Sequence, residues 1–281
     1  MRSRRELYVD VASHGVTIYG LDYDSETAYF PLPAGIFDGL FADSGDGALG
    51  ATGSAVEDMI ASLNLRLPKV GTTVLVANMG KTAVRIADLS GITKPTKKNF
   101  PEAKQWNLVA ANFPIGKKMN ENTHNFDGNI FANNNGQARF FMTALPVAVS
   151  DIIAKIGIAL TGSIHRVDRL DTAEHILFRR YAAKADATES LLITLPQDDG
   201  LRLLHIAENL PNAAHYISNH PTHREDEFLR FLNTINSTSK KDNNSKTAIL
   251  LNNKHTLQDW QWLHAILSVN DFDVTEEGYV K

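Results

Sequence analysis

One succession of elements is predicted twice along this chain, and this repeat restricts the folds that the chain can adopt. Three short segments rich in Val, Ile, Tyr and Thr, each closed by a turn signal, occupy residues 6–33. Three further strands in quick succession are predicted within residues 190–219. A segment with helical spacing and a further strand follow each trio, within residues 54–78 and 224–253. Strands and helices in this mixed order predict an α/β protein of two lobes rather than a β-sandwich.

The composition is that of a folded protein and excludes several functional classes. The chain has 281 residues, of which 43% are hydrophobic, so it can bury a substantial core as one large domain or two of ordinary size. Its 28 basic and 32 acidic residues give a net charge of −4, so no nucleic-acid partner is expected. The absence of cysteine excludes disulfides and thiolate chemistry and fits a cytoplasmic protein. No apolar run approaches the roughly 20 residues of a membrane span, so we expect no direct span.

Two irregular stretches interrupt the first lobe. Residues 34–53 are rich in glycine, but they match neither GxxxxGK[ST] nor GxGxxG, and their aspartates would repel phosphate; we expect a connecting loop. Residues 91–137 are rich in Asn and Lys and contain one clear strand, at 106–113, which predicts a small α+β subdomain inserted into the first lobe. The predicted organisation is therefore a first lobe over 1–170 and a crossover helix with a reduced second lobe over 171–281.

Further elements are predicted around this insert. Strands are expected at 72–78, 82–89, 138–145 and 163–170, and helices after Pro146, over 171–185 with Asp171 as N-cap, and over 256–267. The histidines include the pair His220 and His223 in a turn, but there is no HExxH pattern, and no GxSxG nucleophile is present. The sequence thus predicts no metal ligands and no catalytic residue.

Five stretches carry a resemblance to a known family: the hairpin VDVASHGVTI, the segment PAGIFDGLFAD, the block from ARFFMTALP to LFRRYA, the second hairpin TLPQDDGLRLLHI and the strand AILLNN. In their order and spacing they resemble the actin-like superfamily of actin, Hsp70 and sugar kinases, and in particular the pilus-assembly protein PilM and the cytoplasmic domain of the type II secretion protein GspL. The resemblance implies two ribonuclease-H-like, actin-like lobes, with the inserted subdomain in the first.

The resemblance also indicates where a nucleotide would bind. Asp10 matches the aspartate that helps to organise magnesium in active members, and Ser13 and Gly15 complete a remnant phosphate hairpin, in which Ala12 replaces a glycine. Hairpins of this kind hold phosphate through backbone N–H groups at close approach, which an added Cβ hinders.

The second half of the nucleotide site departs further from the family pattern. Thr194 stands at the place of the second aspartate, Pro196 replaces a glycine and removes a donor, and Asn252 and Asn253 replace the glycines beside the adenosine. The expectation is therefore a protein without a cofactor and without catalysis. Residual binding of ATP and magnesium is the alternative.

By resemblance, the function expected is that of a non-catalytic, cytoplasmic scaffold in the assembly of a type IV pilus or a type II secretion-like system. Such a protein lies at the inner membrane through its partners and binds the short cytoplasmic tail of an inner-membrane protein; an assembly ATPase is a further partner to consider. The insert would hold this peptide near Trp106, Phe113 and Phe126. The alternatives are an actin-like ATPase or small-molecule kinase with a divergent nucleotide site, and an interaction module of another pathway.

Overall fold

The first five-stranded sheet contains three antiparallel strands followed by two parallel ones. Its order is β3-β2-β1-β4-β8, in which β1 pairs antiparallel with β2 and parallel with β4. The strands are β1 (Glu6–Ala12), β2 (Gly15–Tyr19), β3 (Glu26–Pro31), β4 (Thr72–Asn78) and β8 (Val167–Thr172). Both faces of β4 are covered by the core, with Val74 and Val76 on one face and Leu75 on the other, as expected of a strand in the middle of a covered sheet.

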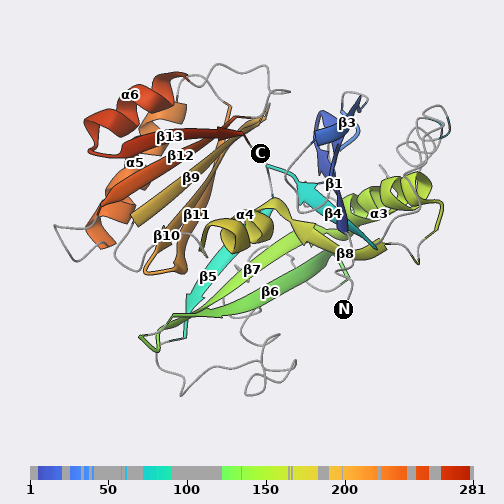
Figure 1. Cartoon of the computed structure of the whole chain (residues 1–281), viewed down its shortest axis with the longest axis horizontal. Helices are drawn as coiled ribbons and strands as arrows, with labels where there is room; N and C mark the ends of the chain where they lie inside the picture. Colours follow the sequence, from blue (N-terminus) through green and yellow to red (C-terminus); the bar gives the residue numbers. More distant parts are fainter. Residues whose placement is uncertain are drawn as a thin grey trace.

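The second five-stranded sheet repeats this topology. Its order is β11-β10-β9-β12-β13, again with an antiparallel trio joined to two parallel strands. The strands are β9 (Ser190–Gln197), β10 (Gly200–Ala207), β11 (Leu210–Ser218), β12 (Lys246–Asn252) and β13 (Asp273–Gly278). The prediction of two lobes of one architecture is confirmed, and Figure 1 shows the two sheets side by side.

A third sheet of three antiparallel strands lies below the other two in Figure 1. It has the order β5-β7-β6 and is formed by β5 (Ala83–Asp88), β6 (His124–Ala132) and β7 (Ala138–Pro146). Its first strand precedes the stretch predicted as an insert, 91–137, and its last strand follows it. The bounds of that insert and the division of the chain at residue 170 stay predictions.

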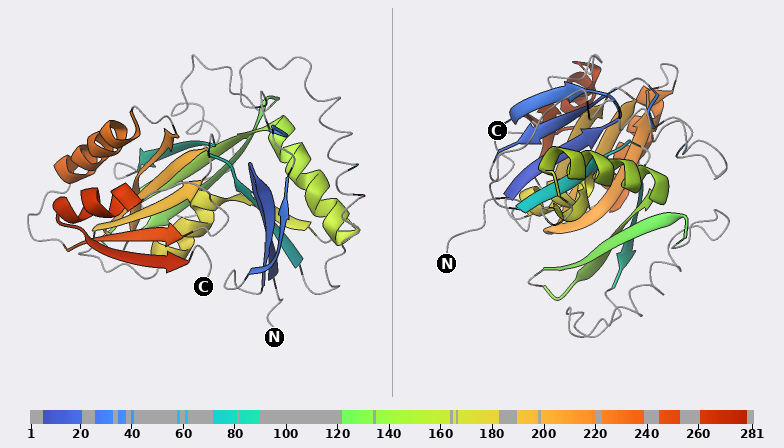
Figure 2. Two further views of the ribbon diagram at one scale, coloured as in Figure 1. Left: turned by 90° about the horizontal axis from the view of Figure 1, so that it is seen from above. Right: turned by 90° about the vertical axis from the view of Figure 1, so that its right-hand side faces the viewer.

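Four helices can be followed in full. They are α3 (Val147–Thr161), α4 (Ala173–Ala182), α5 (Arg224–Thr238) and α6 (Gln261–Val269). As expected, α3 begins directly after Pro146; it ends at Gly162, whose φ of 72° gives the left-handed conformation in which the Gly162 N–H reaches the Ile158 carbonyl at 2.7 Å. Figure 2 shows α3 beside the first sheet and α5 and α6 on the outer face of the second.

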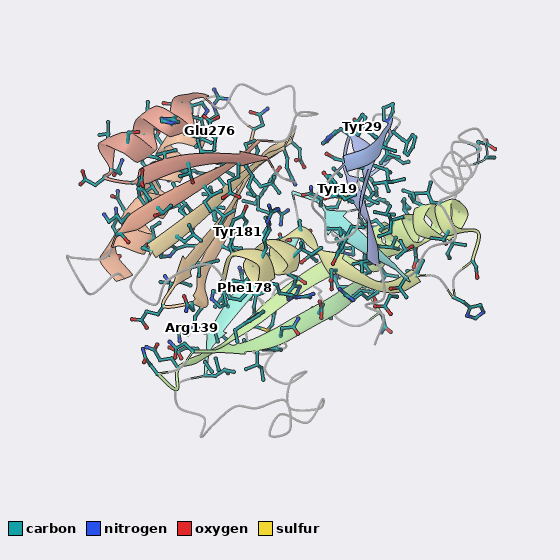
Figure 3. The ribbon with its side chains drawn as sticks, in the orientation of Figure 1. Tyr19, Tyr29, Arg139, Phe178, Tyr181 and Glu276 are labelled. Atoms are coloured by element: carbon teal, nitrogen blue, oxygen red, sulfur yellow. The ribbon has the colours of Figure 1, made fainter. Side chains whose placement is uncertain are left out.

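An apolar cluster joins the sheets to one another through α4. It contains Val74 and Val76 of β4, Phe141 of β7 and Phe178 of α4, together with Leu195 and other buried residues of the second sheet. Figure 3 labels Phe178 and Tyr181 on α4, where the elements meet. The lobes therefore share one packed core of apolar side chains.

This computed structural model describes residues 6–20, 26–32, 35–37, 40, 58, 61, 72–80, 82–89, 122–133, 135–163, 165, 167–182, 190–197, 199–219, 223–238, 245–252 and 261–278. The predicted strand at 106–113 and the predicted start of the last helix, at 256, lie outside these ranges. Within them, no helix is long and apolar enough to cross a membrane.

The junction between the strand expected at 163–170 and the helix expected at 171–185 lies two residues later than predicted. The strand expected at 163–170 is β8, which runs to Thr172, so Asp171 lies in a strand and α4 begins after it. Asp171 pairs with Val76 in the sheet, and its carboxylate accepts hydrogen bonds from Arg169 at 2.9 Å and Arg179 at 3.2 Å. These tertiary contacts override its preference for a helix N-cap.

Candidate functional site

The first hairpin, between β1 and β2, is covered by a tyrosine from β3. The Tyr29 hydroxyl donates a hydrogen bond to the His14 carbonyl oxygen at 3.4 Å, and the Leu32 N–H donates to the same oxygen at 2.9 Å. A Cβ atom on Gly15 would lie 2.4 Å from the Tyr29 ring, so only glycine fits against it. Figure 3 labels Tyr29 on this edge of the molecule.

The second hairpin, between β9 and β10, has the same construction. The Tyr216 hydroxyl donates to the Asp199 carbonyl oxygen at 2.6 Å, and the Asn219 N–H donates to it at 2.9 Å. A Cβ atom on Gly200 would lie 2.6 Å from the Tyr216 ring. Burial, aided by the charge of Asp199, raises the pKa of Tyr216 above its ordinary value, so the hydroxyl stays protonated as a donor at neutral pH.

Strand register relates the two hairpins residue by residue. In the first sheet Thr17 lies between Asp10 and Tyr29 on adjacent strands, and in the second sheet Arg202 lies between Leu195 and Tyr216. The equivalent pairs are Asp10 with Leu195, Thr17 with Arg202, and Tyr29 with Tyr216.

The motif predicts Thr194 at the place of the second aspartate. The strand register shows that the residue equivalent to Asp10 is instead Leu195. A shift of one residue in a strand moves a side chain to the other face of the sheet. Thr194 is fully buried, and its hydroxyl donates to the Ile249 carbonyl oxygen at 3.3 Å. With leucine at this position, the second hairpin has no carboxylate to match that of Asp10.

Asp10 itself is buried, with only 2% of its surface exposed, and lies beside the end of β4. The Asn78 side-chain amide donates to Asp10 Oδ2 at 3.4 Å. The Gln197 side-chain amide donates in turn to Asn78, to its Oδ1 atom and to its carbonyl oxygen. A chain of polar side chains thus runs from the first hairpin to the second, and sequence reasoning did not find Asn78 or Gln197.

The remaining predicted site residues are only partly covered by the structure. Ser13 lies in the turn between β1 and β2 and is half-buried, two residues before Gly15, which begins β2. Asn252 is the last residue of β12, and Asn253 lies outside the described residues. Across the ranges that can be searched, no three His, Asp or Glu side chains come together to hold a metal ion.

Of the three residues predicted to contact a partner peptide, the structure places Phe126. It lies on β6 opposite Ala144 and packs, half-buried, on the small core of the third sheet. Its ring centroid lies 6.2 Å from that of His124. Trp106 and Phe113 lie outside the described residues, so the convergence of the three stays a prediction.

Two solved structures share this architecture over nearly its whole length. One is a crystal structure of a Bacteroides thetaiotaomicron protein described as having an actin-like ATPase fold and unknown function; it is 11% identical, with a TM-score of 0.59, over 97% of this chain and 91% of that one. The protein described here has an actin-like fold. The other structure is the PilM-PilN type IV pilus biogenesis complex, 10% identical with a TM-score of 0.59, over 98% of this chain and 88% of that one.

Neither a protein-family description nor a curated protein matches the sequence. At identities of 10% and 11% the actin-like similarity lies in backbone architecture, and it establishes the fold. Function must be argued from the site.

Proposed function

We propose that this actin-like protein is a non-catalytic scaffold in the assembly of a type IV pilus or a type II secretion-like system. The observation that carries the proposal is the structural similarity to the PilM-PilN complex, which extends over 98% of this chain. The hairpins support it, because Leu195 and Gln197 occupy the positions equivalent to Asp10 and Ala12, so the second hairpin has neither a carboxylate nor a glycine there. A catalytic role would require groups that these positions lack.

The proposed partner is an inner-membrane protein that presents a short cytoplasmic peptide. The exposed part of β6 and the Phe126 side chain form the described part of the proposed contact surface, and Trp106 and Phe113 are proposed to complete it. An assembly ATPase is proposed as a second partner. In this role the protein is cytoplasmic and is held at the inner membrane by its partners.

Peptide binding tests the proposal directly. The gene neighbourhood is searched first for a single-span membrane protein; a fluorescein-labelled synthetic peptide with the sequence of its cytoplasmic segment is then the probe, and anisotropy gives the Kd. We expect saturable binding, weakened about tenfold or more by Phe126→Ala if this ring is an anchor. The control is Val269→Ala on α6, because Val269 is 83% exposed and lies on the second lobe.

Two results would contradict this proposal. The absence of saturable binding would refute the proposed peptide partner. Equal Kd values for wild type and Phe126→Ala would show that Phe126 on β6 is not part of the contact surface. Equal weakening by both variants would show a general effect on folding.

Retention of Asp10 at the first hairpin favours a second candidate, an actin-like ATPase or small-molecule kinase with a divergent site. This candidate predicts stabilisation by ATP and magnesium, since a ligand at 100 times its Kd adds about 2.7 kcal/mol to the free energy of unfolding. A rise in Tm that Asp10→Asn abolishes would favour the enzyme over the scaffold.

A further inference from the structure

The three residues that end β4 and follow it, Asn78, Met79 and Gly80, contact the second lobe directly; we call them the β4 extension. A Cβ atom on Gly80 would lie 2.5 Å from the Tyr216 ring and 2.7 Å from Asp199 Oδ2. The backbone of the first lobe therefore packs on the tyrosine that covers the second hairpin. Gly80 is needed here because of this close approach.

A buried arginine joins the β4 extension to the second sheet and to α4. Arg202, 3% exposed on β10, donates to the Met79 carbonyl oxygen and forms an ion pair with Glu174, which is fully buried on α4. A buried ion pair is tolerated only where further polar groups satisfy it. The first lobe supplies one such group, the Met79 carbonyl, so moving the lobes apart would strip a partner from a buried charge.

Polar contacts continue on both sides of this arginine. On one side, Gln197 donates to Asn78, which donates to Asp10 of the first hairpin. At a separate place, the Asn133 side-chain amide, beyond the end of β6, donates at 3.3 Å to the Glu208 carbonyl in the turn between β10 and β11. Contacts at two separated places resist both opening and rotation of one lobe against the other.

The apolar core reinforces these contacts. Val74 and Val76, which precede the β4 extension on the same strand, belong to one cluster with Leu195 and Leu251 of the second sheet. Separating the lobes would expose this cluster to water, at about 25 cal/mol per Å² of apolar surface.

We propose that the β4 extension, Arg202 and Gln197 act as a clamp that fixes the two lobes in one relative orientation, so that the actin-like core is a rigid platform whose lobes need no nucleotide to close. In proteins that close two lobes around a ligand, the ligand supplies the contacts that hold the closed state. Here side chains and backbone of the chain itself make contacts between the two hairpins. This property is independent of whether a pilus partner binds.

Distances between spin labels on the two lobes test the clamp, and the chain suits this method because it has no cysteine. Cysteines replace Asp151 on α3 and Asn233 on α5, which are both exposed. We expect one narrow distance distribution that is unchanged by ATP with magnesium. A broad or double distribution, or a shift of its maximum on addition of the nucleotide, would overturn the proposal.

Two glycine variants distinguish the clamp from general stability. In Gly80→Ala the new methyl group meets Tyr216 of the other lobe at 2.5 Å, whereas in Gly157→Ala it meets Leu75 of the same lobe, also at 2.5 Å. We expect Gly80→Ala to widen the interlobe distribution and Gly157→Ala to leave it narrow.

A third variant covers the case in which Gly80→Ala does not fold. Gln197→Leu removes the amide that donates to Asn78 and keeps most of the side-chain volume. We expect it to widen the distribution in the same way. An unchanged, narrow distribution in every folded variant of the clamp would refute a role of these residues in fixing the lobes.

Discussion

His205 should make this protein less stable as the pH falls below neutral. The side chain is fully buried on β10, where its Nε2 atom lies 2.8 Å from Ser190 Oγ and its Nδ1 atom lies 3.0 Å from Asn212 Nδ2. The amide of Asn212 donates, so Nδ1 accepts and the ring is neutral. Burial lowers the pKa of His205 from 6.5 to about 4.

The sign of the effect follows from proton binding. Between pH 6.5 and about 4 the unfolded chain binds a proton at His205 and the folded chain does not, so acidification favours unfolding. For this one group the free energy of unfolding should fall by about 1 kcal/mol from roughly pH 7.5 to roughly pH 5.5, and by about 3 kcal/mol in total below both pKa values. Above pH 6.5 its contribution is fully present.

Urea unfolding followed by circular dichroism at the two pH values measures this effect. His205→Gln keeps a polar group that cannot be charged, so the loss of stability on acidification should be smaller than in the wild type by about 1 kcal/mol. His175→Gln is measured for comparison, because burial also lowers the pKa of His175, although the charge of Asp127 opposes this shift. Its loss of stability on acidification should therefore also be smaller than that of the wild type. A wild-type pH dependence in His205→Gln would refute the reasoning.

Three further predictions concern the hairpins and the buried ion pair. Gly200→Ala should lower the free energy of unfolding by about 1–3 kcal/mol, because the methyl group would lie 2.3 Å from the Ile217 carbonyl oxygen and 2.6 Å from the Tyr216 ring, and a Cm in urea equal to that of the wild type would contradict this. Tyr216→Phe should destabilise by about 1 kcal/mol, more than Tyr29→Phe, because its hydrogen bond is 2.6 Å long against 3.4 Å; equal losses would contradict this ranking. Arg202→Met should cost about 3–5 kcal/mol by leaving Glu174 buried and charged, whereas the double variant with Glu174→Leu should recover much of the loss, and additive losses in the double-mutant cycle would argue against a coupled pair.

The strands of the two hairpins could be predicted because their signals are local. Val, Ile, Tyr and Thr identified the first trio, short Leu- and Ile-containing runs between turn residues identified the second, and the resemblance indicated Asp10 as a site residue. The covering tyrosines occupy matching positions in the sequence, because Tyr29 and Tyr216 each lie two residues before the end of the third strand of their trio.

The strand register could not be predicted from the sequence patterns, which placed Thr194 where the structure has Leu195. Both residues lie in one buried strand, in which neighbouring positions are apolar or small on both faces, so alternation does not say which face a side chain takes. Pairing with β10 decides it.

By itself the sequence determined two α/β lobes with the same order of strands, since hydrophobic spacing and turn residues act over a few neighbours. Only the tertiary structure decided how the lobes meet. Gln197 and Asn78 are 119 positions apart, and Arg202 and Met79 are 123 apart. Such contacts depend on the packing of whole sheets around a shared core, and no local pattern encodes which polar groups that packing brings together.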